Sequence, residues 1–186
     1  YEALQGWFAR RHGWQIRREE VLCTTGVVPA VSAVIKAFTR PGDGVALMTP
    51  AYNCFFSSIR NNGCFAAETS LLMGDAGWTI DFAALEKTLA DPRVKVLLFC
   101  SPHNPVGRVW TADEIRRTAQ IAHQAGVLFV CDEIHGEFVF GGNRYLPAAQ
   151  VEGVDPLRTV ILTSPTKTFN LAGAGIAAII AADPKV

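Results

Sequence analysis

The chain has 186 residues, roughly the length of one domain, and its 17 basic and 17 acidic residues cancel. Because this balance gives no strong charge to either sign, we expect neither nucleic acid nor a membrane surface as a partner of this segment. No apolar run approaches the length of a transmembrane helix, and no signal peptide is visible.

Apolar runs typical of strands alternate with helical patterns along the chain. Strands are predicted at residues 20–24, 44–48, 64–68, 94–100, 127–131, 159–163 and 175–181. Helices are predicted at residues 30–38, where Pro29 suits the first helical position, and at 52–61, 82–89 and 111–125. Residues 75–79 and 141–144 are expected to form loops. This alternation, with little polar patterning in the strands, predicts an α/β fold with a mostly parallel sheet.

The first residues and the cysteines give two further expectations. A helical pattern with Leu4, Trp7 and Phe8 is already under way at the start of the chain, which lacks an initiator methionine, so we expect a segment of a longer protein. The five cysteines form no C-x-x-C pair, and Cys23, Cys100 and Cys131 each end an apolar run. They are expected to be reduced thiols, these three buried, in a cytoplasmic protein.

Polar or turn-rich segments follow five of the predicted strands. They are residues 24–29, 49–52, 101–107, 132–135 and 164–167. In a parallel sheet the ligand crevice lies outside the carboxyl ends of the strands. The five segments therefore predict one site at one edge of the sheet.

Several of these residues have an ordinary structural interpretation beside a functional one. The turn at Gly26 could simply join a strand to a helix, or its helix N-terminus could bind a phosphate through backbone N–H groups. Tyr52 could belong to the core or stack on a planar ring. Asn104 could lie in a plain loop, or its two flanking prolines could fix the direction of its amide.

Asp132 and Lys167 carry the strongest chemical signal. Asp132 directly follows a buried strand and could be a helix cap, an ion-pair partner, or the partner of a protonated pyridine nitrogen. Its D-E-x-H pattern also occurs in nucleotide-hydrolysing enzymes, but the sequence has no G-x-x-x-x-G-K-[ST] phosphate loop. Lys167 stands just past another strand, behind Ser164 and Thr166, and could be solvated or could form an imine with a carbonyl cofactor.

Taken in order, these segments resemble the large domain of the fold-type I enzymes that depend on pyridoxal 5′-phosphate, the class I and II aminotransferase family. The similarity covers nearly the whole chain and rests on Asn104 within Ser-Pro-His-Asn-Pro-Val-Gly, Asp132 28 residues later and Lys167 a further 35 residues on. The sequence is most similar to the cystathionine β-lyase-like branch of C–S lyases. The segments that carry this similarity are residues 49–56, 100–110, 132–135 and 167–173.

The resemblance implies a three-layer α/β/α fold and a role for each motif. Residues 1–186 would be part of the cofactor-binding large domain, with an N-terminal segment and a C-terminal small domain outside this chain. Lys167 would form the imine and move the Cα proton, and Asp132 would keep the pyridine nitrogen protonated. Asn104 would bind the 3′-oxygen and Tyr52 would stack on the ring. The phosphate would be held by the turn of Gly26, Val27 and Val28, with Ser164 and Thr166.

Two positions depart from the pattern of the aspartate aminotransferase-like members. His135 stands where those members have a tyrosine, and the lyase-like branch suggests that it takes over the bond to the 3′-oxygen. Gly175 stands where they have a phosphate-binding arginine, so one phosphate charge must be met elsewhere.

The resemblance implies a C–S β-lyase that releases a thiol, pyruvate and ammonia from cystathionine or another cysteine S-conjugate. Because the same residues serve transamination, a class I/II aminotransferase is the alternative. A pyridoxal-enzyme-like domain of a regulatory protein is the alternative from another class. The family also implies a homodimer whose site is completed across the interface, and little activity for this segment alone.

Overall fold

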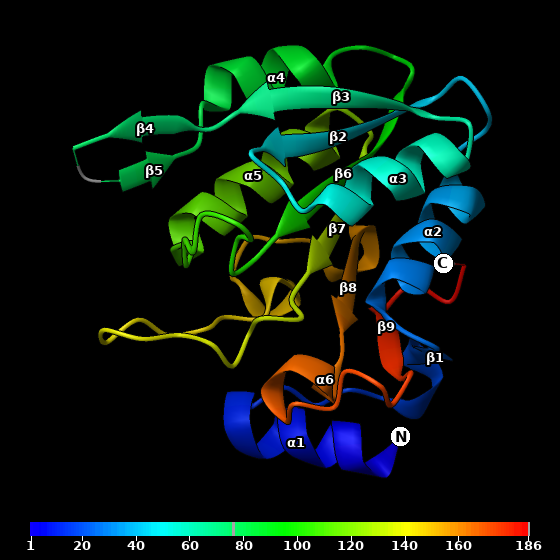
Figure 1. Ribbon diagram of the computed structural model, residues 1–186, viewed down its shortest axis with the longest axis vertical. Helices are drawn as coiled ribbons and strands as arrows, with labels where there is room; N and C mark the ends of the chain where they lie inside the picture. Colours follow the sequence, from blue (N-terminus) through cyan, green and yellow to red (C-terminus); the bar gives the residue numbers. More distant parts are fainter. Residues whose placement is uncertain (76, 186) are drawn as a thin grey trace.

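The computed structural model describes residues 1–75 and 77–185 and has a seven-stranded sheet at its centre (Figure 1). The strand order is β1-β9-β8-β7-β6-β2-β3. The strands are β1 (Val21–Thr24), β2 (Gly44–Thr49), β3 (Phe65–Ser70), β6 (Val94–Cys100), β7 (Leu128–Asp132), β8 (Thr159–Thr163) and β9 (Ala177–Ala181). A separate two-stranded sheet pairs β4 (Leu72–Gly74) with β5 (Gly77–Thr79).

The strand directions bring the predicted polar segments to one edge. Strands β3, β2, β6, β7 and β8 are parallel to one another, whereas β9 is antiparallel to both β8 and β1. Strand β1 therefore runs in the same direction as the parallel set. The carboxyl ends of β1, β2, β6, β7 and β8 consequently share an edge, and the predicted mostly parallel sheet is confirmed.

Helices cover both faces of the sheet, so the predicted three-layer arrangement is confirmed (Figure 1). Helices α2 (Val27–Phe38) and α3 (Asn53–Asn61) cover one face, and α1 (Glu2–His12), α4 (Phe82–Leu89) and α5 (Ala112–Gln124) cover the other. The short α6 (Pro165–Thr168) follows β8 and lies beside α1. Single 3₁₀ turns occur at Arg18–Glu20, Ala148–Gln150 and Pro156–Arg158.

The sequence of β6 shows why the sheet is buried on both faces. Its side chains alternate, so that Val96 and Leu98 pack in the core under α2 and α3, whereas Leu97 and Phe99 pack in the core under α4 and α5. All four are at most 2% exposed. This continuous apolar run holds the carboxyl end of β6 rigidly beside that of β7.

Local signals in the sequence set several helix boundaries. Thr111 caps α5 in a reciprocal capping box with Glu114, as predicted. Helix α2 begins at Val27, three residues before the predicted start, so Pro29 is the third helical residue. The missing N–H of Pro29 is tolerated there because the first N–H groups of a helix have no intrahelical acceptor.

Other predictions are corrected by the structure. Residues 77–79 pair as β5 and are not a loop, while Ala76 in the same predicted loop lies outside the described residues. Cys23 is exposed, because β1 is an edge strand, whereas Cys100 and Cys131 are buried as predicted. In the part of the chain that the structure describes, no helix is both long and apolar enough to cross a membrane.

Candidate active site

A cavity at the carboxyl edge of the sheet, here called the lysine cavity, collects most of the predicted site residues. It lies where β6 separates β2 from β7, which is the position at which the strand order reverses. The predicted residues that line it are Val27, Val28, Tyr52, Asn104, Asp132, His135 and Lys167. Gly26, Ser164 and Thr166 do not line it. Segments from across the whole chain therefore meet around one space.

Asp132 is the last residue of β7 and only 5% exposed. Its carboxylate accepts one backbone hydrogen bond, from the N–H of Ile134 at 3.1 Å, and forms no ion pair with any residue in the described ranges. Burial raises the pKa of Asp132 to about 6, against the opposing effect of the Ile134 N–H. The cavity thus contains a buried carboxylate that lacks a positive partner.

The amino end of α2 presents free backbone donors to the same cavity. Gly26 has φ 156° and ψ 164°, a conformation open essentially to glycine alone, and it turns the chain from β1 into the helix. Val27 and Val28 follow as the first two helical residues and line the cavity. Their N–H groups have no intrahelical acceptor, and the helix dipole is positive at this end. This geometry suits an anion.

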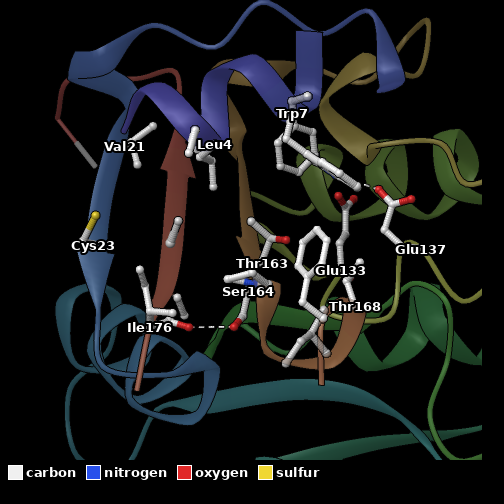
Figure 2. Close-up of a pocket in the computed structure, with 18 of the residues that line it drawn as sticks. Leu4, Trp7, Val21, Cys23, Glu133, Glu137, Thr163, Ser164, Thr168 and Ile176 are labelled. Carbon is white, nitrogen blue, oxygen red and sulfur yellow. Dashed lines mark hydrogen bonds between the residues drawn. The ribbon is translucent and has the colours of Figure 1, made fainter. Parts of the chain in front are cut away.

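Lys167 lies on α6, a short helix that is fixed at both ends. Ser164 caps it by accepting the N–H of Thr166 at 3.1 Å, and Pro165 takes the first helical position. The Ser164 hydroxyl also donates to the carbonyl of Ile176 at 2.6 Å (Figure 2). After the helix, Asn170 adopts φ 53°, a left-handed conformation that asparagine tolerates. The Ser164 hydroxyl is therefore engaged in shaping α6.

The pKa values of Tyr52 and His135 are shifted by burial and by neighbouring groups. The pKa of Tyr52 is raised by a hydrogen bond with Cys54, by burial and by the charge of Asp132. The pKa of His135 is lowered by burial and by the positive charge of Lys167. The imidazole of His135 is therefore neutral at physiological pH.

The segment between β6 and α5 directs Asn104 into the cavity. Both of its prolines, Pro102 and Pro105, follow cis peptide bonds. The His103 ring reaches the carbonyl of Pro50 at 3.0 Å, and the indole of Trp110 donates to the carbonyl of Cys100 at 2.9 Å. Buried side chains thus fix the backbone on both sides of Asn104.

Two cysteines, Cys54 and Cys100, also line the lysine cavity. Composition and spacing predict a core position for Cys100 and assign no role to Cys54. The signal that could have indicated a place at the site for Cys100 is its position at the end of a strand. Cys100 ends β6 and is paired in register with Asp132 at the end of β7, so it lies at the carboxyl edge with the polar residues.

A second and larger cavity, here called the α1 groove, lies between α1 and the β1, β9 and β8 end of the sheet (Figure 2). Its volume is about 390 Å³, against about 130 Å³ for the lysine cavity. Two carboxylates border it, and both are satisfied. Glu133 accepts hydrogen bonds from the Tyr145 hydroxyl and, at 2.7 Å, from the Ala148 N–H. Glu137 accepts from Trp7 at 2.9 Å and contacts His12 at 2.7 Å.

Gly175 lies between α6 and β9 with φ 54°, a left-handed conformation. A Cβ at this position would meet the carbonyl oxygen of Thr25 at 3.6 Å. Gly175 itself does not line the lysine cavity.

The whole chain, residues 1–186, matches the model of the family "aminotransferase class I and II", and the protein belongs to this family. It is 37% identical over 182 residues to cystathionine beta-lyase PatB of Bacillus subtilis strain 168, covering 98% of this chain and 47% of that protein. It is 36% identical over 169 residues to protein MalY of Escherichia coli K12, covering 91% of this chain and 43% of that protein.

The fold is also similar to that of enzymes whose structures have been determined. The crystal structure of cystalysin from Treponema denticola, which contains a pyridoxal 5′-phosphate cofactor, matches with a TM-score of 0.94 and 40% identity. The match covers 98% of this chain and 46% of cystalysin. The fold class expected from the sequence is thereby confirmed. The chain spans about half the length of the relatives it matches.

Proposed function

We propose that this chain provides the pyridoxal 5′-phosphate site of a C–S β-lyase. The observation that carries the proposal is the buried carboxylate of Asp132, which forms no ion pair with another described residue, in the same cavity as the amine of Lys167. A buried carboxylate without a partner is costly for a protein to keep. A protonated pyridine nitrogen would supply the missing charge, and the amine of Lys167 would meet the carbonyl carbon of the same cofactor.

The residues of the lysine cavity fit this cofactor group by group. Lys167 offers an amine for its carbonyl carbon, and Asp132 offers a carboxylate for its ring nitrogen. The N–H groups of Val27 and Val28 suit its phosphate, and Asn104 and Tyr52 suit the oxygen and the face of its ring. Gly26 permits the turn from β1 into α2, and Ser164 caps α6 by accepting the N–H of Thr166.

The proposed reaction divides among these groups. Bound pyridoxal phosphate supplies an electron sink for negative charge that develops at the substrate Cα. Asp132, which is 5% exposed, would keep the ring nitrogen protonated, because a charge interacts strongly with its partner in a buried place. Lys167 Nζ would take the Cα proton of the bound amino acid. Loss of a thiolate from Cβ then gives, after hydrolysis, pyruvate and ammonia.

The substrate proposed is cystathionine or another cysteine S-conjugate. The support is the 37% identity to a protein named cystathionine beta-lyase and the high similarity to cystalysin. The second candidate is an aminotransferase, which the family description favours. The residues of the lysine cavity serve both reactions, so the outcome depends on whether a leaving group occupies Cβ.

We further propose a cytoplasmic homodimer. All five cysteines are free thiols, which suits a reducing compartment. Large apolar side chains are exposed around β1 and the segment after α6, including Leu22 at 55%, Phe169 at 50% and Ile176 at 45%. An exposed apolar region of this kind is typical of an assembly surface.

The proposal is tested on the full-length protein. Purified apoprotein is incubated with pyridoxal phosphate and should develop the yellow absorbance band of a covalently held cofactor. Addition of cystathionine should release pyruvate. Transfer of the amino group to an oxo acid without pyruvate would replace the lyase by the aminotransferase.

Replacement of Lys167 by alanine should abolish the band and lower pyruvate release by at least about 1,000-fold, since both imine formation and proton transfer depend on it. Replacement of the exposed Lys36 by alanine is the matched control and should leave both unchanged. A band that persists in the Lys167→Ala protein would remove the central assignment.

A further inference from the structure

The thiol of Cys100 connects two backbone groups in the segment that carries Asn104. Its Sγ donates to the carbonyl oxygen of Pro102 at 3.2 Å and accepts the backbone N–H of Asn104 at 3.4 Å. Cys100 is 3% exposed, so neither bond is shared with bulk water. A side chain therefore performs here what a backbone carbonyl performs in an ordinary turn.

The thiol can play this part because it keeps its proton. Burial and the neighbouring charge of Asp132 raise the pKa of Cys100 well above its ordinary value. Cys100 and Asp132 are register partners at the ends of β6 and β7. A protonated thiol can donate and accept at once, and it adds no negative charge beside the carboxylate.

The other anchors of this segment contact different residues. Trp110 donates to the carbonyl of Cys100 itself, and His103 contacts the carbonyl of Pro50 on the far side of the turn. The sulfur of Cys100 alone, among these anchors, contacts the backbone of Asn104, whose side chain lines the lysine cavity. This bond therefore holds the backbone of Asn104 next to the lysine cavity.

We propose that Cys100 is a positioning residue that fixes the Asn104 amide toward the cofactor through its thiol hydrogen bonds. The inference rests on the function proposed above. It separates Cys100 from an ordinary core cysteine, whose contribution is volume alone.

Two substitutions distinguish the hydrogen bonds from the volume. Cys100→Ser keeps a group that donates and accepts but is smaller, whereas Cys100→Val fills the space but cannot form either bond. Leu98→Val is the control, because Leu98 packs in the same core, two residues earlier on β6, and does not line the cavity.

The measurements are the dissociation constant of pyridoxal phosphate for each full-length apoprotein, from absorbance titration, and the pH midpoint of the absorbance band. Cys100→Val should weaken binding about tenfold and shift the midpoint, because a buried N–H is left without an acceptor. Cys100→Ser should stay within about threefold of the parent protein. The control should match the parent in both measurements.

The thermal midpoint of each protein provides the second measurement. Cys100→Val should have a lower thermal midpoint than Cys100→Ser, because it leaves the buried N–H of Asn104 without an acceptor. If both measurements place valine above serine, Cys100 contributes only volume and the proposal fails. If the parent protein binds no pyridoxal phosphate, the proposed function fails, whereas a parent that binds normally beside an unaffected valine variant overturns the role of Cys100 alone.

Discussion

Asp132 and Glu133 are consecutive carboxylates, both at most 5% exposed, that face different regions of the molecule. Glu133 borders the α1 groove, where the Tyr145 hydroxyl and the Ala148 N–H satisfy it. Asp132 borders the lysine cavity and receives only the N–H of Ile134. Burial raises the pKa of both, to about 7 for Glu133 and about 6 for Asp132.

The difference between the two shows how a structural carboxylate and a functional one are told apart. Burial and raised pKa are common to both, so neither property identifies the site. What distinguishes the two carboxylates is the number of protein groups that donate hydrogen bonds to each. Glu133 fixes the segment that returns toward residues 145–148, whereas Asp132 keeps acceptor capacity that the described protein groups leave unused.

The largest expected effect concerns Asp132→Asn in the full-length protein. We expect pyruvate release to fall by about 100-fold or more, because a neutral amide cannot hold the ring nitrogen protonated. The apoprotein should nevertheless become more stable at pH 8, by up to about 3 kcal/mol, since the substitution removes a carboxylate whose pKa rises from 3.8 to about 6 on folding. Urea unfolding of both apoproteins measures this.

The way in which the stability gain of Asp132→Asn varies with pH follows from the upward shift of the pKa of Asp132 on folding. Well below pH 3.8 the carboxyl group is protonated in both the folded and the unfolded state, so parent and variant should be equally stable. The parent loses stability as the pH rises from about 4 to about 6, and the gain of the variant should be complete above that range. A variant less stable than its parent at pH 8 would mean that Asp132 has an internal cation partner.

Glu133→Ala should have the opposite effect on stability. The Tyr145 hydroxyl and the Ala148 N–H would both lose their acceptor in a buried region, which costs about 3 kcal/mol. Thermal unfolding of the apoprotein at about pH 4 measures the loss, because there Glu133 is largely protonated in both states and its raised pKa no longer offsets the lost hydrogen bonds. Glu152→Ala, at an exposed acid, is the control and should change stability by less than about 0.5 kcal/mol. A stable Glu133→Ala protein would contradict the distinction between the two carboxylates.

The smallest expected effect is that of Tyr145→Phe, which removes one of the two donors to Glu133 and should cost about 1 kcal/mol. In the Glu133→Ala background the same change should cost less, because the partner is already absent. The four proteins of this double-mutant cycle are compared by thermal unfolding. Equal costs in both backgrounds would show that the two side chains do not interact.

Most of the fold was predictable because its strands are long apolar runs bounded by turn residues. Strands at 94–100 and 159–163 were predicted to the residue, and the capping box set the start of α5. The reversed direction of β9 was not predictable, since an apolar run carries no signal of direction. The exposure of Cys23 depends on β1 being an edge strand, which is a property of strand order.

The site was predictable where a residue stands out chemically at a strand end. Lys167, Asp132 and Asn104 meet that condition, and the structure brings them to one cavity. Cys100 did not stand out, because a small apolar residue at the end of an apolar run is ordinary. Its two hydrogen bonds depend on how the backbone turns after β6, and that turn is formed by residues up to Trp110.

The backbone conformation of Gly175 limits which side chains this position can accept. An arginine introduced there would have to adopt φ 54°, a conformation that costs an ordinary residue about 1–2 kcal/mol. A single substitution therefore cannot restore the side chain of the aspartate aminotransferase-like members without a penalty. A different course of the loop before β9 would be needed to accept an arginine at this position without that penalty.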